Sequence, residues 1–218
     1  YLPLADATVI EHALAVLLRM PTLCKVIVSL GADDDYWPDL PCAQDARIAH
    51  AVGGKERQDS VLNALEALSD SHGAHAEDWV LVHDAARPCL TLADVETLVA
   101  SVIPACERDA LCGGGLLAAP MDNTVKEIGE VGSQAAPFVA ATANRERLWQ
   151  ALTPQLFPLG LLKQALHDAA AHAVQLTDES SALERLGYRP LLVAGAKTNI
   201  KITHASDLLL AEAILASR

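Results

Sequence analysis

The segment His83 to Pro88 (HDAARP) places an acidic and a basic residue close together, directly after the apolar run WVLV at 79–82. Asp84 and Arg87 lie three residues apart in it. A carboxylate can hold a magnesium ion or a substrate hydroxyl, and a guanidinium can bind a phosphate through two hydrogen bonds. An Asp-Arg pair that only braces its loop would have the same sequence. The residues alone leave both interpretations open.

A second candidate is the segment GGKERQDS at 53–60. Its two glycines let backbone amides approach a base or a ribose, and Ser60 lies near the start of a predicted helix. A plain turn from strand to helix with solvated charges would look the same. The segment is neither a G-x-G-x-x-G motif nor a Walker loop, so by itself it is weak evidence for a nucleotide pocket.

Two more candidates lie near the C-terminus. Lys201 interrupts the apolar segment NIKIT at 199–203, so its ammonium group either extends from a sheet edge into solvent or faces an anion. Thr177, Asp178 and Glu179 are polar residues before a predicted helix, and capping that helix is their commoner use.

Strands and helices alternate along the chain and must position these residues. The hydrophobic pattern predicts strands at 24–30, 47–52, 79–84, 115–120, 190–194 and 198–202, and helices at about 8–20, after Gly54, from Thr91, and at about 159–172, 178–186 and 207–216. This alternation predicts an α/β fold, Rossmann-like, with a mostly parallel sheet flanked by helices. In such sheets ligands bind beyond the carboxyl ends of the strands, where HDAARP and GGKERQDS lie.

The rhythm changes between 121 and 147. Two short β-like runs, at 124–127 and 138–142, flank a Gly-Glu-Val-Gly-Ser turn at 129–133 with no core helix between them. We expect a protruding β-hairpin arm at about 121–147. Because no linker or repeat is visible, residues 1–218 are predicted to form a single domain.

Composition excludes several classes of protein. The net charge of −12 disfavours nucleic acid as a partner. The sequence contains no run of eighteen apolar residues, so a membrane span is not predicted. The five cysteines include no C-x-x-C pair, and the eight histidines have no zinc-binding spacing, so no metal site built from protein side chains is predicted. Reduced thiols fit a cytoplasmic protein.

Taken together, the motifs resemble the 2-C-methyl-D-erythritol 4-phosphate cytidylyltransferase family along nearly the whole chain. The resemblance rests on GGKERQDSV (53–61), WVLVHDAARPCL (79–90), AAPMDNTVK (118–126), NRERLWQALTPQLF (144–157), LTDESSALE (176–184) and NIKIT (199–203). The related ribitol-phosphate cytidylyltransferases usually have a less alanine-rich turn in place of HDAARP. They are the nearest alternative, and a catalytically degenerate dimeric binding module is a second one.

The resemblance implies a GT-A-like nucleotidyltransferase of the bacterial cytoplasm that transfers a cytidylyl group from CTP to a small polyol phosphate. Mg²⁺ would be carried mainly by the CTP phosphates, and the arm would join a homodimer whose two active sites are shared. Lys201 would position the substrate phosphate near the α-phosphate, and Arg145 and Thr124, carried on the arm, would hold the same substrate phosphate from the neighbouring subunit. The other implied contacts are Asp84, Arg87, Thr153 and Thr177 for the substrate, and Gly54, Ser60 and Ala85 for the cytidine.

The sequence departs from the family pattern at two places. In the family, a strand and a glycine-rich loop with an arginine and a lysine precede the segment that begins here at Tyr1. We expect the physical protein to extend upstream by such a segment. Lys55 stands where an acidic residue is common, so any ribose contact is expected from the backbone there rather than from the side chain.

Overall fold

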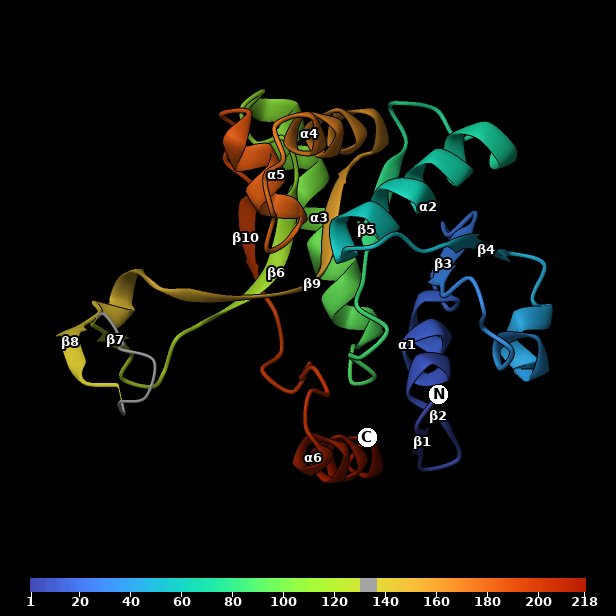
Figure 1. Ribbon diagram of the computed structural model, residues 1–218, viewed down its shortest axis with the longest axis horizontal. Coiled ribbons are helices and arrows are strands. Elements are labelled where there is room, and N and C mark those ends of the chain that lie inside the picture. Colours follow the sequence, from blue (N-terminus) through green and yellow to red (C-terminus); the bar gives the residue numbers. More distant parts are fainter. Residues whose placement is uncertain (130–136) are drawn as a thin grey trace.

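Helices cover both faces of a mixed β-sheet in the computed structural model, which describes residues 1–129 and 137–218 (Figure 1). The larger sheet has the strand order β10-β6-β9-β5, formed by β5 (Trp79–Val82), β6 (Gly115–Pro120), β9 (Trp149–Pro158) and β10 (Leu191–Ala194). Strand β10 is parallel to β6, whereas β9 is antiparallel to both of its neighbours. A separate parallel pair consists of β3 (Val26–Leu30) and β4 (Ile48–Val52).

Six helices and several short elements complete the described structure. The helices are α1 (Val9–Leu17), α2 (Arg57–His72), α3 (Leu92–Arg108), α4 (Leu159–Ala171), α5 (Glu179–Arg185) and α6 (Ala205–Ala216). The short elements are β1 (Pro3–Leu4), β2 (Ala7–Thr8), η1 (Trp37–Asp39) and η2 (Pro41–Gln44). Within residues 1–129 and 137–218, no helix has both the length and the apolar character needed to cross a membrane.

Two apolar clusters hold helices against opposite faces of the larger sheet. Leu156 belongs to the cluster that includes Leu98 of α3, whereas its neighbour Phe157 belongs to the cluster that includes Leu65 of α2 and Leu162 of α4. Successive side chains of a strand point to opposite faces, so the dipeptide Leu156-Phe157 contributes to both layers of the core.

Local hydrogen bonds explain where several helices begin. Thr8 and Glu11 form a capping box at the start of α1, and the Thr91 hydroxyl accepts a hydrogen bond from the Asp94 amide at the start of α3. Asp178 caps α5 by accepting a hydrogen bond of 3.0 Å from the Ser181 amide. The commoner use of the segment at 177–179, as a helix cap, is therefore confirmed for Asp178.

Two sequence predictions need correction. The pattern did not predict β9, because its two prolines and its polar residues Thr153 and Gln155 break the apolar pattern of a buried strand. The predicted strand at 198–202 is wrong. This segment is irregular, and its Asn199 side chain and Ile202 amide donate hydrogen bonds to the carbonyls of Thr153 and Ala86 instead of forming a strand ladder.

The predicted arm is present as the antiparallel pair β7 (Lys126–Ile128) and β8 (Val139–Thr142), which projects from the body of the molecule (Figure 1). The short helix η3 (Arg145–Arg147) leads from the arm into β9. Most of the predicted turn at 129–133 lies outside the described residues.

Candidate active site

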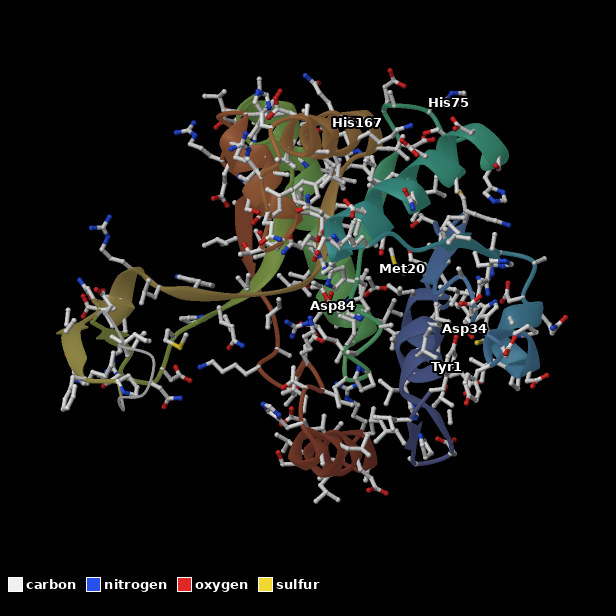
Figure 2. All side chains as sticks on the ribbon, in the orientation of Figure 1. Tyr1, Met20, Asp34, His75, Asp84 and His167 are labelled. Carbon is white, nitrogen blue, oxygen red and sulfur yellow. The ribbon has the colours of Figure 1, made fainter. Side chains whose placement is uncertain are left out.

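Asp84 lies just beyond the carboxyl end of β5 (Figure 2), and three cationic side chains contact its carboxylate. Its Oδ1 accepts hydrogen bonds from Nε and Nη2 of Arg57 at 3.2 and 3.1 Å. Its Oδ2 lies 3.1 Å from Nζ of Lys201 and accepts a longer hydrogen bond of 3.4 Å from Nε of Arg87. The structure therefore brings together Asp84, Arg87 and Lys201, which sequence analysis singled out separately.

The surroundings of Asp84 keep its carboxylate ionised. Burial alone would raise the pKa of Asp84, but the charges of Arg57, Lys201 and Arg87 outweigh burial and lower it below its ordinary value. The Lys201 side chain is 42% exposed although it pairs with a carboxylate that is only 12% exposed. Lys201 can therefore meet an incoming anion without leaving Asp84.

A chain of hydrogen bonds fixes the backbone of the Asp84 loop. The Asp84 amide donates to the Thr153 hydroxyl at 3.1 Å, and that hydroxyl lies 2.9 Å from Nδ1 of His83. Nε2 of His83 lies 3.2 Å from the Arg87 carbonyl, which can only accept, so Nε2 carries the proton and Nδ1 accepts from Thr153. Burial lowers the pKa of His83 to about 4, which keeps the ring neutral in this chain.

Arg87 and Asn199 join the Asp84 loop to the Lys201 segment. Nη1 of the buried Arg87 donates to the Asn199 carbonyl at 2.8 Å, and Nδ2 of Asn199 donates to the Thr153 carbonyl at 2.7 Å. Oδ1 of Asn199 is buried and has no hydrogen-bond partner among the described atoms. These bonds make the position of Lys201 depend on the loop that carries Asp84.

Arg57 and Glu179 also belong to this cluster, although the sequence patterns did not predict them as members. Nη1 and Nη2 of Arg57 donate to the two carboxylate oxygens of Glu179 at 2.5 and 3.1 Å, and the Glu179 side chain is 1% exposed. Burial raises the pKa of Glu179, and Arg57 opposes that rise. Both residues stand inside motifs that carry the resemblance, GGKERQDSV and LTDESSALE, but nothing in the sequence links two positions 122 residues apart.

The predicted cytidine residues lie next to this cluster. The Gly54 amide donates to the Ser60 hydroxyl at 2.9 Å, and a Cβ atom at Gly54 would lie 2.2 Å from Cβ of Asp59. Only glycine therefore fits this turn without a backbone shift. Ser60 and Ala85 line the same cavity as Asp84 and Lys201.

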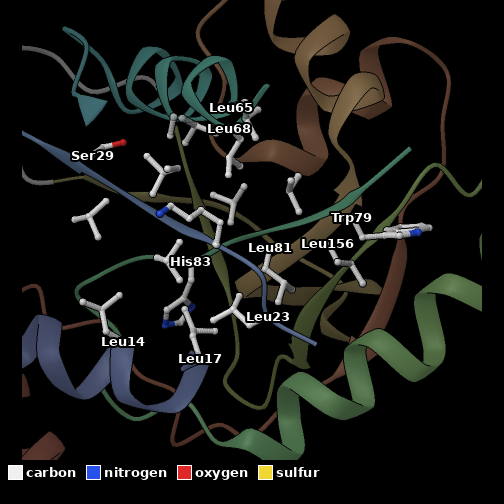
Figure 3. Close-up of a pocket in the computed structure, with 18 of the residues that line it drawn as sticks. Leu14, Leu17, Leu23, Ser29, Leu65, Leu68, Trp79, Leu81, His83 and Leu156 are labelled. Atoms are coloured by element: carbon white, nitrogen blue, oxygen red, sulfur yellow. The ribbon is translucent and has the colours of Figure 1, made fainter. Parts of the chain in front are cut away.

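That cavity has a volume of about 900 Å³ and lies between β3 and β5 (Figure 3). Its walls are mostly apolar and include Val28 of β3, Val80 of β5 and Leu65 of α2, whereas Asp84, Arg57 and Lys201 form a polar part of the lining. In the described chain, β3 pairs only with β4, and β5 pairs only with β9. Two unpaired strand edges thus border the cavity.

Three predicted residues do not join the cluster within one chain. Nη1 of Arg145 donates to the Asp122 carbonyl at 2.6 Å, and Thr124 is exposed on the arm. No hydrogen bond or ion pair in the described part of the chain links either residue to Asp84 or Lys201. Thr177 is also exposed and lines a separate cavity of about 420 Å³, next to Arg147 and Trp149.

The described side chains do not form a cage for magnesium. They include no group of three or more His, Cys, Asp or Glu residues that could hold a metal ion. Both carboxylate oxygens of Asp84 already face cations, and Glu179 is paired with Arg57. A divalent ion bound through these residues would have to displace Lys201, Arg87 or Arg57.

Comparison with known proteins identifies the family of this chain. A family model described as IspD: 2-C-methyl-D-erythritol 4-phosphate cytidylyltransferase matches residues 1–217. The chain belongs to this cytidylyltransferase family. The 2-C-methyl-D-erythritol 4-phosphate cytidylyltransferase of Pseudomonas entomophila is 48% identical over 208 residues, which cover 95% of this chain and 83% of that protein.

Solved structures of the cytidylyltransferase family show the same fold. A crystal structure of 4-diphosphocytidyl-2C-methyl-D-erythritol synthase has a TM-score of 0.83 and 34% identity, covering 99% of this chain and 93% of that chain. The Francisella tularensis cytidylyltransferase has a TM-score of 0.80 and 31% identity, covering 96% of this chain and 89% of that chain. The predicted Rossmann-like nucleotidyltransferase fold is confirmed, and the ribitol-phosphate branch is not favoured.

Proposed function

We propose that this chain transfers a cytidylyl group from CTP to 2-C-methyl-D-erythritol 4-phosphate, giving 4-diphosphocytidyl-2-C-methyl-D-erythritol and pyrophosphate. The observation that best supports this reaction is the partly exposed Lys201 ammonium group, held 3.1 Å from Asp84 beside the cavity lined by Ser60 and Ala85. Family membership supports the choice of substrates.

The chemistry needs cations more than a nucleophilic side chain. A phosphate oxygen of the acceptor attacks the α-phosphorus of CTP and forms a new P–O bond, while the bond to the bridging oxygen breaks and pyrophosphate leaves with its electrons. Both reactants are anions, so positive charge must draw them together and stabilise the charge of the transition state. We assign this role to Lys201, near the α-phosphate, and to Arg145 of a second subunit.

Direct contacts with the acceptor are proposed for three residues. Asp84 is proposed to accept hydrogen bonds from the acceptor hydroxyls, and the exposed Thr177, together with Thr124 of a second subunit, is proposed to contact the same ligand. The buried Thr153 hydroxyl and two nitrogens of the buried Arg87, Nε and Nη1, already bond to the Asp84 and Lys201 segments, so we assign both residues to holding those segments in place.

The cytidine is proposed to bind at the turn of Gly54 and Ser60 and along the backbone of Ala85. Mg²⁺ is proposed to arrive with the CTP phosphates, since the described side chains form no cage for it. When bound, it would neutralise phosphate charge. The free cysteines and the bacterial relatives support a location in the bacterial cytoplasm.

The arm is proposed to contact a second copy of the chain in a homodimer. Phe138, Val139 and Ile128 are 80%, 62% and 61% exposed, and an isolated two-stranded ribbon is only marginally stable in water. Pairing about a twofold axis would bury these side chains and bring Arg145 and Thr124 to the neighbouring active site.

A side-by-side turnover assay tests the proposed function. The purified protein is incubated with CTP, Mg²⁺ and either 2-C-methyl-D-erythritol 4-phosphate or ribitol 5-phosphate, and pyrophosphate release is measured. We expect a much higher kcat/KM with the methylerythritol substrate. Preference for ribitol 5-phosphate would overturn the acceptor assignment, and no release with either acceptor would favour a degenerate binding module.

A further inference from the structure

Among the described residues, only Arg57 donates side-chain hydrogen bonds to both Asp84 and Glu179. Its guanidinium donates two hydrogen bonds to Oδ1 of Asp84 and two to the carboxylate of Glu179. It stands at the first turn of α2, Asp84 follows β5, and Glu179 begins α5. One planar group thus connects three segments that are distant in the sequence.

The positions of the oxygens suggest what this contact does. Because Arg57 engages Oδ1 of Asp84, the other oxygen, Oδ2, is directed to Lys201 and Arg87. Glu179 is almost completely buried and receives both of its charge-assisted hydrogen bonds from Arg57, so it holds the guanidinium in one orientation. A lysine could not make this planar, two-sided contact.

The geometry points to Arg57 as a positioning residue that, anchored by Glu179, orients Asp84 so that Oδ2 faces Lys201. This role rests on the proposed function, in which Asp84 binds the acceptor hydroxyls and Lys201 lies near the reacting phosphates. It assigns Arg57 no contact with substrate. The same residue connects α2, whose preceding turn carries the proposed cytidine contact Gly54, to the acceptor side of the site.

The variants Arg57→Met, Glu179→Gln and their combination separate this role from simple structural support. Arg57→Met leaves the buried Glu179 carboxylate without its partner and should lower Tm. Adding Glu179→Gln removes that charge at nearly constant shape and should restore most of the lost Tm. Turnover should not recover with it, because Asp84 still lacks the group that orients it. We expect kcat to remain on the order of 10²-fold below the parent in both Arg57→Met proteins.

Arg185→Met is the matched control. Arg185 lies in α5, like Glu179, but pairs with Asp168 at the surface, so its loss should change neither Tm nor kcat appreciably. If kcat of the double variant returns to the parental value together with Tm, Arg57 is only a structural residue and the inference fails. Parental kcat in Arg57→Met alone would overturn it as well.

A titration that does not depend on activity completes the test. The groups facing Asp84 are Arg57, Arg87, Lys201 and the neutral His83, and those facing Glu179 are Arg57 and Asp178. Losing Arg57 removes the largest opposing charge, so the Asp84 carboxyl ¹³C resonance should titrate at higher pH in both Arg57→Met proteins. An unchanged Asp84 titration would overturn the inference. Pyrophosphate release by the parent reports separately on the proposed function.

Discussion

Asp84 concentrates the chemistry of this site in one carboxylate that touches three cations. The three cations differ in what else they contact. Arg57 also binds Glu179 and Arg87 also binds the Asn199 carbonyl, whereas the ammonium group of Lys201 is partly exposed to solvent. The lysine is therefore the cation best placed to respond to a ligand.

Replacing Lys201 by alanine should reduce turnover far more than stability. A side chain that acts on transition-state charge contributes on the order of 2 to 4 kcal/mol, so kcat should fall about 30- to 10³-fold. Tm should change little, because Lys201 is exposed and the Asp84 carboxylate keeps Arg57 and Arg87. Steady-state kinetics and a melting curve check this, and kinetic constants equal to those of the parent would demote Lys201 to a structural role.

His83 should make the fold sensitive to acid. Its pKa is lowered from 6.5 to about 4, so between these pH values the His83 ring is protonated in the unfolded chain but stays neutral in the native protein. Its contribution lowers stability progressively as the pH falls from about 6.5 to 4, by about 3 kcal/mol in total. His83→Gln should flatten this part of the stability curve in urea titrations at several pH values. A His83→Gln curve that runs parallel to that of the parent between pH 6.5 and 4 would refute the assignment.

The elements of the fold were predictable to different degrees, and the reasons are physical. Strands β3 and β6 are apolar runs, and helix α3 has an amphipathic pattern that begins at a clear N-cap residue, so the sequence alone located all three. Strand β9 was not predicted, because its pairing with β5 and β6, and not its amino-acid composition, makes it a strand. Lys201 was predicted as a candidate site residue on a strand, but the segment that carries it is irregular. Arg57 was missed because its role depends on a contact between distant segments.

The turn before α2 provides a prediction at the scale of an element. In Gly54→Ala the new Cβ would collide with Cβ of Asp59 at 2.2 Å, so the turn must shift away from Ser60. Overpacking of this kind costs about 1 to 3 kcal/mol, and KM for CTP should rise more than KM for the acceptor. Gly31→Ala is the matched control, because nothing lies within 4 Å of its Cβ position. Equal changes in the two KM values would argue against Gly54 in the cytidine pocket.

At the scale of the whole molecule, the proposed shared site can be tested by mixing subunits. Arg145→Ala and Lys201→Ala homodimers should each be nearly inactive, because every site lacks one cation. In a mixed dimer, the chain carrying Arg145→Ala keeps its own Lys201 and receives Arg145 from its partner, so one of the two sites is whole. With free 1:1 exchange about half of the dimers are mixed, and activity should approach roughly a quarter of the parent value.

Mass spectrometry of the mixture must first show that subunits have exchanged. If mixed dimers form and activity still stays at the level of the single variants, Arg145 acts within its own chain or not at all, and the arm does not complete a neighbouring site.

The cavity between β3 and β5 has a consequence for handling the polypeptide of residues 1–218. The two unpaired strand edges can exchange backbone hydrogen bonds with an extended segment that enters, and the apolar walls can bury its side chains. We expect this polypeptide, prepared alone, to enhance the fluorescence of a hydrophobic dye and to self-associate by strand addition as its concentration rises. An extended peptide rich in β-branched residues should occupy the cavity between β3 and β5. It should therefore lower the dye fluorescence and prevent self-association of the polypeptide.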